Sequence, residues 1–409
     1  MPNAPITKAL PRYDEAINIA LAQVTALDQT ETLRLRDCVD RVLAKPVKAD
    51  RDLPPFNRSA LDGYALNAHA FSANRTWPVV GTIAAGAEPG PAVPSDACVA
   101  IATGAPLPAG LNVVIAHERS DRGDRSGKPV TFSVDAVEAG QGVHQRGADA
   151  NEGDMLIESH VVIGPQHIGL AATVGVDQME VVCKPTAHVI TTGDEVVMPP
   201  IQPAPHQIRN SNGPQTSALL HDMGADVVSH EHLADDFETV MRALEKATST
   251  SHLVITVGGV SAGDRDHVPG ALAQLGMKTL IKGCAMQPGR PVLIGQCGKS
   301  LVVGLPGNPV SALVCSTLFI WPLIRQLLGL QPELPWRNVR LDTDVKPNAK
   351  RQAFRPARVN GNTAHVPPWA GSGDLSHTAQ TNGVVALPRQ TEMMTEGMML
   401  PFVAWPSMR

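Results

Sequence analysis

The chain has 409 residues, of which 43% are apolar, so several folded domains with sizeable cores are expected. The 34 basic and 39 acidic residues give a net charge of −5, which excludes nucleic acid and an anionic membrane as expected partners. The six cysteines form no C-x-x-C pair, so neither a structural zinc site nor a disulfide framework is indicated. No signal-peptide pattern begins the sequence, and we expect a cytoplasmic protein with reduced thiols.

The first part of the chain combines helical patterns with a β-rich segment. Helices are expected at 13–25 and 32–43, and a third begins at Pro165, a residue that suits the first position of a helix. Between 77 and 150 short apolar runs alternate with Gly and Pro, which is typical of a small β domain. Its strands are expected at 79–83, 99–102, 113–116 and 130–134.

From Ala187 to Gly329 apolar runs alternate with helical patterns, which predicts an α/β domain. Residues 252–257 and 301–305 are apolar on both faces, as in parallel strands buried between two helix layers. The apolar segment 309–324 is interrupted by Pro322, so we expect a buried helix there and not a membrane span. Other expected elements are strands at 188–192, 226–229 and 291–295, helices at 213–223, 236–248 and after Asp266, and a small β barrel or sandwich over 333–409.

Ligands bind to parallel sheets where the strands end, so the loops 258–266 and 306–311 are the expected functional loops. Gly258 and Gly259 allow the backbone to approach an anion, and amides at the start of the next helix can hold phosphate oxygens. Asp264 and Asp266 in the same loop would repel phosphate unless a cation lies between them, which favours bridging Mg²⁺. The alternative is that one of these carboxylates caps the following helix.

Other carboxylates are expected at the same edge of the sheet. Glu195 follows a strand and would face the crevice of Asp266 if the sheet is parallel. Asp235 begins the pattern Asp235-Asp-Phe-Glu238, which by itself favours a helix capping box. Arg290 offers a cation for an anionic ligand, and the alternative is a solvated surface arginine. Pro309 begins a helix whose N-terminus attracts anions, and the alternative is an ordinary helix start.

Taken together, these segments resemble the molybdopterin molybdenumtransferase family, which includes MoeA and the E domain of gephyrin. The resemblance extends in unbroken order from about residue 10 to residue 400. The matching stretches are 53–64, 81–86, 102–106, 146–149, 191–195, 210–212, 257–263 with Asp266, 288–291, 304–311, 371–376 and 381–383.

The resemblance implies a multidomain α/β plus β fold. Its parts are an extended N-terminal region (1–50 and 145–182), an inserted small β domain (51–144), a three-layer α/β domain resembling molybdopterin adenylyltransferase (183–330) and a C-terminal β barrel-like domain (331–409). It also implies an elongated homodimer, with the active cleft between the α/β domain of one subunit and the inserted domain of the other. The implied reaction converts adenylated molybdopterin and molybdate into molybdenum cofactor and AMP, with Mg²⁺.

The family pattern assigns site residues by position in this sequence. The implied catalytic residues are Asp62, Thr103, Glu195, Asp235 and Asp266, and the last three also hold the metal. The implied ligand-binding residues are Asp149, Gly258, Gly259, Ser261, Gly263, Pro288, Arg290, Pro306, Asn308, Pro309 and Ser311. Molybdopterin adenylyltransferase and molybdoenzymes are the implied protein partners.

The sequence departs from the family at several positions. Gln287 and Gly283 stand where the family usually has cations, and Lys282 or Arg290 are the candidates to replace them. Two other functions stay open: a molybdopterin adenylyltransferase on the same α/β core, and a scaffold that binds molybdopterin without turnover. The sequence also leaves open whether molybdate or tungstate is the natural oxyanion.

Overall fold

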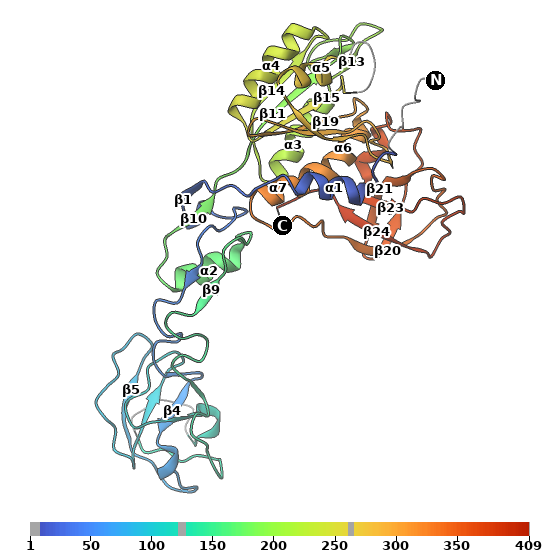
Figure 1. Cartoon of the computed structure of the whole chain (residues 1–409). Coiled ribbons are helices and arrows are strands. Elements are labelled where there is room, and N and C mark those ends of the chain that lie inside the picture. Colours follow the sequence, from blue (N-terminus) through green and yellow to red (C-terminus); the bar gives the residue numbers. More distant parts are fainter. Residues whose placement is uncertain (1–8, 122–127, 261–265, 409) are drawn as a thin grey trace, which may run out of the picture.

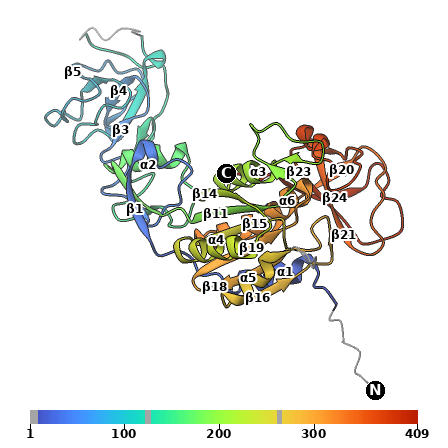
Figure 2. The same cartoon turned by 90° about the horizontal axis from the view of Figure 1, so that it is seen from above.

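The computed structural model describes residues 9–121, 128–260 and 266–408. The molecule is elongated (Figures 1 and 2). A small β domain containing β4 and β5 lies at one end, and the α/β part and the C-terminal strands lie together at the other. A narrow region with α2 and the β1–β10 pair connects the two ends.

The α/β part is built on a six-stranded sheet with the order β14-β11-β15-β19-β18-β16. The first four strands are parallel to one another. At one edge, β18 pairs antiparallel with β19, and β16 pairs antiparallel with β18. The edge strand β16 was not expected, because its run of apolar residues is short and has Lys278 and Lys282 at its ends. The strands are β11 (Thr186–Thr192), β14 (Asp226–Leu233), β15 (Leu253–Val257), β16 (Lys278–Lys282), β18 (Leu293–Cys297) and β19 (Ser300–Leu305).

Helices cover both faces of this sheet, because successive strand residues point in opposite directions. Val189 and Ile255 pack into the core shared with α3, α6 and α7. Ile190 and Val254 pack into the other core, shared with α4 and α5. The predicted three-layer domain is therefore confirmed. Its helices are α3 (Asn212–Asp222), α4 (Phe237–Thr250), α5 (His267–Gln274), α6 (Pro309–Cys315) and α7 (Trp321–Leu327), with a π-helical turn at Ser316–Ile320 between the last two.

The N-terminal region corrects one expectation. The expected helix at 32–43 is wrong, since Thr30–Arg34 forms strand β1 and Leu35–Asp37 a 3-10 turn. β1 pairs with β10, which is distant in sequence, and this long-range pairing outweighs the local helical pattern. The other elements of this region are α1 (Tyr13–Leu21), β2 (Val47–Lys48), β9 (Met155–Ile157), α2 (Pro165–Thr173) and β10 (Gln178–Val182).

The inserted segment forms the expected β domain around buried Tyr64 and Trp77. Its sheet has the order β5-β6-β4-β7. The strand expected at 130–134 is reduced to single bridges from Val130 to Trp77 and from Phe132 to Ser120. The strands are β3 (Arg58–Ser59), β4 (Gly63–Leu66), β5 (Val79–Ile83), β6 (Cys98–Ile101), β7 (Val113–Ala116) and β8 (Val143–His144).

The C-terminal strands form a closed five-strand barrel, in which the β21–β23 pairing completes the ring. β17, which lies between β16 and β18 of the α/β sheet in sequence, pairs with the start of β21 and joins the two parts. The elements are β17 (Met286–Gln287), β20 (Arg337–Leu341), β21 (Gln352–Asn360), β22 (Thr363–His365), the 3-10 helix Ser376–Gln380, β23 (Gly383–Leu387) and β24 (Met399–Ala404).

Pro309–Leu327 is the only helical stretch in the described part of the chain that is long and apolar enough to cross a membrane. However, 89% of its apolar window is buried inside the fold. The stretch packs with α3 and the sheet in one continuous core, as expected for 309–324. Tyr13 of α1 contacts the same stretch, since its hydroxyl donates a hydrogen bond to the carbonyl oxygen of Leu318 at 3.0 Å.

Gly63 is expected to be essential for the inserted domain. A Cβ atom at this position would overlap the carbonyl oxygen of Ile115 on the paired strand β7. We expect Gly63→Ala to lower the free energy of unfolding of this domain by about 1–3 kcal/mol. Faster hydrogen exchange of the backbone amides in β4 and β7 measures the loss of stability. Gly81→Ala is the control, because nothing lies within 4 Å of its Cβ; equal protection in both variants would contradict the prediction.

Candidate functional site

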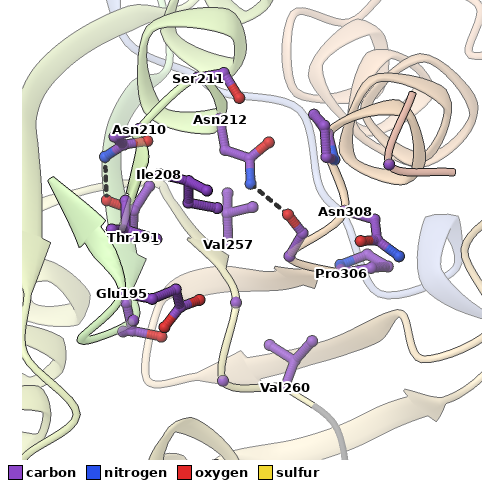
Figure 3. A pocket seen from close by; sticks show the side chains of 18 of the residues that line it. Thr191, Glu195, Ile208, Asn210, Ser211, Asn212, Val257, Val260, Pro306 and Asn308 are labelled. Atoms are coloured by element: carbon purple, nitrogen blue, oxygen red, sulfur yellow. Dashed lines mark hydrogen bonds between the residues drawn. The ribbon is translucent and has the colours of Figure 1, made fainter. Parts of the chain in front are cut away.

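A cavity of about 710 Å³ lies where β11, β15 and β19 end. We call it the carboxylate cavity, because Glu195, Asp235 and Asp266 all belong to its lining. Figure 3 shows part of it, with Glu195 and Val260 on one side and Asn212, Pro306 and Asn308 on the other. The structure therefore brings together three carboxylates from three separate loops.

The capping interpretation of Asp235 is wrong. Asp236 is the N-cap of α4, and its side chain accepts a hydrogen bond from the backbone N–H of Thr239 at 2.8 Å. The helix begins one residue later than the sequence pattern indicates. Asp235 is consequently not used as a cap, and it lines the carboxylate cavity.

The electrostatics of Asp235 reflect its surroundings. Burial raises the pKa of its carboxyl, and the nearby carboxylates of Asp194 and Glu195 raise it further. The backbone N–H of Asp235 donates to Asp194 Oδ1 at 3.1 Å, which holds the two loops together. Several negative charges therefore gather at one end of the cavity, where a bound cation would relieve their repulsion.

The loop after β15 lies close against β11. Gly258 and Gly259 have φ angles of +91° and +62°, a region that favours glycine. A Cβ on either residue would come within 2.9 Å of Thr192, so glycine is also required for space. Both glycines line the carboxylate cavity, whereas the predicted ligand contacts Ser261 and Gly263, together with Asp264, lie outside the described residues.

An asparagine pair supports the opposite wall and was not among the predicted site residues. The Asn212 side chain donates from Nδ2 to the carbonyl oxygen of Gly307 at 2.7 Å (Figure 3). Asn210 is buried, donates to Thr191 Oγ1 at 2.8 Å and accepts from the N–H of Gly213 at 2.9 Å. The signal in the sequence was Asn210-Ser-Asn212 directly before a helix, since such amides can cross-link neighbouring loops.

A second cavity of about 350 Å³ adjoins the first, and both are lined by Pro291, Pro306 and Asn308. We call it the Arg290 cavity. No Asp or Glu of the described chain lines it, whereas Arg290 and Arg351 both do. Lys282, the other candidate for a replacing cation, lies on β16 and lines neither cavity. The predicted ligand residues Pro288 and Ser311 also line the Arg290 cavity, and Pro309 lines the carboxylate cavity.

Asp62, Thr103 and Asp149 do not reach these cavities within one subunit. Asp62 precedes β4 in the inserted domain, at the far end of the molecule (Figure 1). Its Oδ1 accepts hydrogen bonds from the backbone N–H of Thr103 at 2.7 Å and from Thr103 Oγ1 at 3.0 Å. Asp149 pairs with His144 Nε2 at 3.0 Å. The inserted domain and the segment that directly follows it thus present a small group of polar residues.

Comparison with known proteins identifies the family. Residues 11–175 match the MoeA N-terminal region (domains I and II), 188–326 match a probable molybdopterin binding domain, and 338–405 match the MoeA C-terminal region (domain IV). The molybdopterin molybdenumtransferase of Synechococcus elongatus is 36% identical over 397 residues, covering 94% of this chain and 97% of that protein. The chain belongs to the molybdopterin molybdenumtransferase family.

Other relatives of this family agree in sequence and structure. The molybdopterin molybdenumtransferase of Synechocystis is 32% identical over 377 residues, covering 89% of this chain and 92% of that protein. The crystal structure of the molybdopterin biosynthesis MoeA protein from Pyrococcus horikoshii superposes with a TM-score of 0.84 at 25% identity, over 97% of this chain and all of the other. The resemblance inferred from the sequence is confirmed at the level of the family and its fold.

The raised pKa of Asp235 predicts a pH-dependent effect of Asp235→Asn. In the unfolded chain the group ionises near its ordinary pKa of 3.8, and in the folded protein it ionises only at higher pH. The ionised carboxylate therefore opposes folding above the folded pKa and has no effect below 3.8. In a buffer containing EDTA, we expect the variant to be more stable than the wild type at pH 7, with a difference that shrinks towards pH 4.

Urea unfolding of both proteins between pH 4 and 7 measures this difference. Asp236→Asn is the matched control with the opposite sign. The hydrogen bonds from Thr239 lower the pKa of Asp236, so that variant is expected to lose stability at pH 7. A destabilised Asp235→Asn protein at pH 7 would contradict the proposed repulsion.

Proposed function

We propose that this protein transfers molybdenum from molybdate to adenylated molybdopterin, forming molybdenum cofactor and releasing AMP. The observation that carries the proposal is the pair of adjoining cavities at the ends of the parallel strands. One is lined by Glu195, Asp235 and Asp266 together with a glycine-rich loop, and the other by Arg290 and Arg351. Binding in this arrangement would place a pyrophosphate and an oxyanion next to each other.

The chain's own groups have distinct roles in this proposal. Backbone amides of the loop containing Gly258 and Gly259 hold the phosphates of the adenylated substrate. The guanidinium groups of Arg290 and Arg351 hold molybdate, in place of the cations that Gln287 and Gly283 do not supply. Pro306 and Asn308 line both cavities, so the loop that contains them positions the two substrates relative to each other.

The donor set of the carboxylate cavity suits Mg²⁺. Glu195, Asp235 and Asp266 are hard oxygen ligands, and burial together with the nearby carboxylates of Asp194 and Glu195 raises the pKa of Asp235. No three metal-binding side chains of the described chain lie close enough to hold an ion alone. Mg²⁺ is usually held by one or two carboxylates together with substrate phosphates, which fits this geometry. When bound, it would neutralise charge on the phosphoanhydride.

We infer that the active unit is a homodimer. The carboxylate cavity lies at one end of the elongated chain and the Asp62–Thr103 pair at the other, so one subunit cannot bring them together (Figures 1 and 2). A second subunit running in the opposite direction would place its inserted domain over the cavity of the first. In that arrangement Asp62, Thr103 and Asp149 complete the site in trans.

The remaining expectations follow from this function. The protein acts in the cytoplasm, and it receives its substrate from a molybdopterin adenylyltransferase and passes its product to molybdoenzymes. The division into an N-terminal region (1–50 and 145–182), an inserted domain (51–144), an α/β domain (183–330) and a C-terminal domain (331–409) stays a prediction. The C-terminal barrel and the Arg290 cavity favour molybdenum insertion over adenylyl transfer, because the latter needs no oxyanion site.

Loss of Asp266 tests the proposed reaction. We expect Asp266→Ala to reduce molybdate-dependent AMP release by about 100-fold or more, because a ligand of the Mg²⁺ that would neutralise charge on the phosphoanhydride is removed. The measurement is AMP release from adenylated molybdopterin, with and without molybdate, on purified protein. Circular dichroism checks that the fold is intact, and Glu245→Ala on the exposed side of α4 is the control. A wild-type rate for the Asp266→Ala protein would remove the proposed site.

Mixed dimers test the cleft between subunits. Asp62→Ala and Asp266→Ala proteins are each expected to be inactive alone. After random re-association, a dimer with one chain of each kind contains one site with both aspartates intact, so about a quarter of the wild-type activity should return. If Asp62 and Asp266 acted within the same chain, no mixed dimer would contain an intact site, and activity would not recover.

A further inference from the structure

A third cavity, of about 360 Å³, lies in the C-terminal barrel next to the Arg290 cavity. We call it the Lys346 cavity. Gln287 and Trp369 line both cavities and form the partition between them. The remaining wall includes Lys346, Asn348 and Arg355. None of the site residues predicted from the sequence lies here.

The lining of this cavity is cationic. It includes Lys346 and Arg355 and no Asp or Glu among the described residues. In the described part of the chain, neither cation has a carboxylate within ion-pair distance. With Arg290 and Arg351 on the other side of the partition, two cations lie in each of two adjacent cavities. Such a field attracts anions and disfavours every cationic ligand.

Arg355 is held in an unusual position. Its guanidinium stacks on the ring of Trp369 at 4.3 Å and donates to the carbonyl oxygen of Pro367 at 3.1 Å. Its Nε is buried and has no hydrogen-bond partner. Burial lowers the pKa of this guanidinium to about 10. An anion in the cavity would supply both the missing charge and a missing acceptor.

The partition is fixed by hydrogen bonds. Asn348 donates from Nδ2 to Gln287 Oε1, and its Oδ1 accepts from the backbone N–H groups of Lys350 and Arg351 at 2.8 and 3.1 Å. One short loop therefore carries Lys346 into one cavity and Arg351 into the other. The two cation pairs are preorganised as neighbours with a neutral amide between them.

We propose that the Lys346 cavity binds a second small tetrahedral oxyanion, chemically of the class of molybdate, sulfate and phosphate, next to the oxyanion in the Arg290 cavity. The binding itself follows from charge and shape, whereas molybdate as the natural occupant rests on the function proposed above. An anion bound in the Lys346 cavity is separated from the Arg290 cavity only by the side chains of Gln287 and Trp369. The site thus serves as a holding position for the inorganic substrate.

The test is the number of anions bound by the intact protein. Equilibrium dialysis against molybdate, without pterin, measures bound molybdenum per chain. We expect two for the wild type, one for Lys346→Glu and one for Arg290→Ala. Lys350→Glu is the matched control, because Lys350 is an exposed lysine of the same loop that lines none of these cavities and should still allow two. Competition with sulfate and with phosphate ranks the possible occupants.

The outcomes separate this proposal from the proposed function. Equal binding by the Lys346→Glu and Lys350→Glu proteins overturns the second site and leaves the Arg290 cavity as it is. The second site is also overturned if the wild type binds a single anion that is lost in Arg290→Ala and kept in Lys346→Glu. Two anions on Arg290→Ala would instead contradict the Arg290 assignment within the proposed function. Binding that requires pterin would also overturn the proposal, since a free anion is then not the occupant.

Discussion

The parallel register of β11, β15 and β19 is the constraint on which the rest of the structure depends. Thr191, Val257 and Leu305 lie side by side at the ends of these strands. The chain leaves all three strands in the same direction, so their loops must meet at one edge of the sheet. Glu195, Asp266 and the two glycines come together in this way, and Asp235 joins them from the loop after β14, which is parallel to β11. The hydrogen bond from Gly258 to the carbonyl oxygen of Leu305 holds two of these loops in contact.

Charge is divided along this edge. The carboxylates gather beside the glycine-rich loop, and the cations gather where the C-terminal barrel meets the α/β sheet. The barrel is joined there by β17, which pairs with β21, and by the segment around Ser372, whose Oγ accepts from Asn308 Nδ2 at 2.9 Å. The barrel therefore contributes to the site and is not an appended domain. A substrate with a metal-binding phosphoanhydride on one side and an oxyanion on the other matches this division.

The same junction explains the burial of the helical stretch Pro309–Leu327. The stretch starts at the carboxylate cavity and packs against one face of the sheet. Tyr13 of α1 contacts the middle of the stretch at Leu318. Tyr13 packs its ring against Phe319 of this stretch and Phe354 of the barrel, with ring centroids 5.5 and 5.3 Å apart. An N-terminal residue thereby ties the α/β part to the barrel. The described strands of the inserted domain lie at the opposite end of the molecule from both parts, where they could serve a second subunit in the proposed dimer (Figures 1 and 2).

The sequence by itself determined the family, the three-layer core, the β domains and the residues of the glycine-rich loop, because these depend on local periodicity and on short motifs. Tertiary structure alone decided that Asp236, and not Asp235, caps α4 and that 30–34 is a strand. It also decided that Arg351 and Trp369 line one cavity with Arg290, and that Arg355 stacks on Trp369. Each of these depends on partners far away in the chain. Local patterns specify which structures a segment favours, and only packing determines which side chains share a cavity.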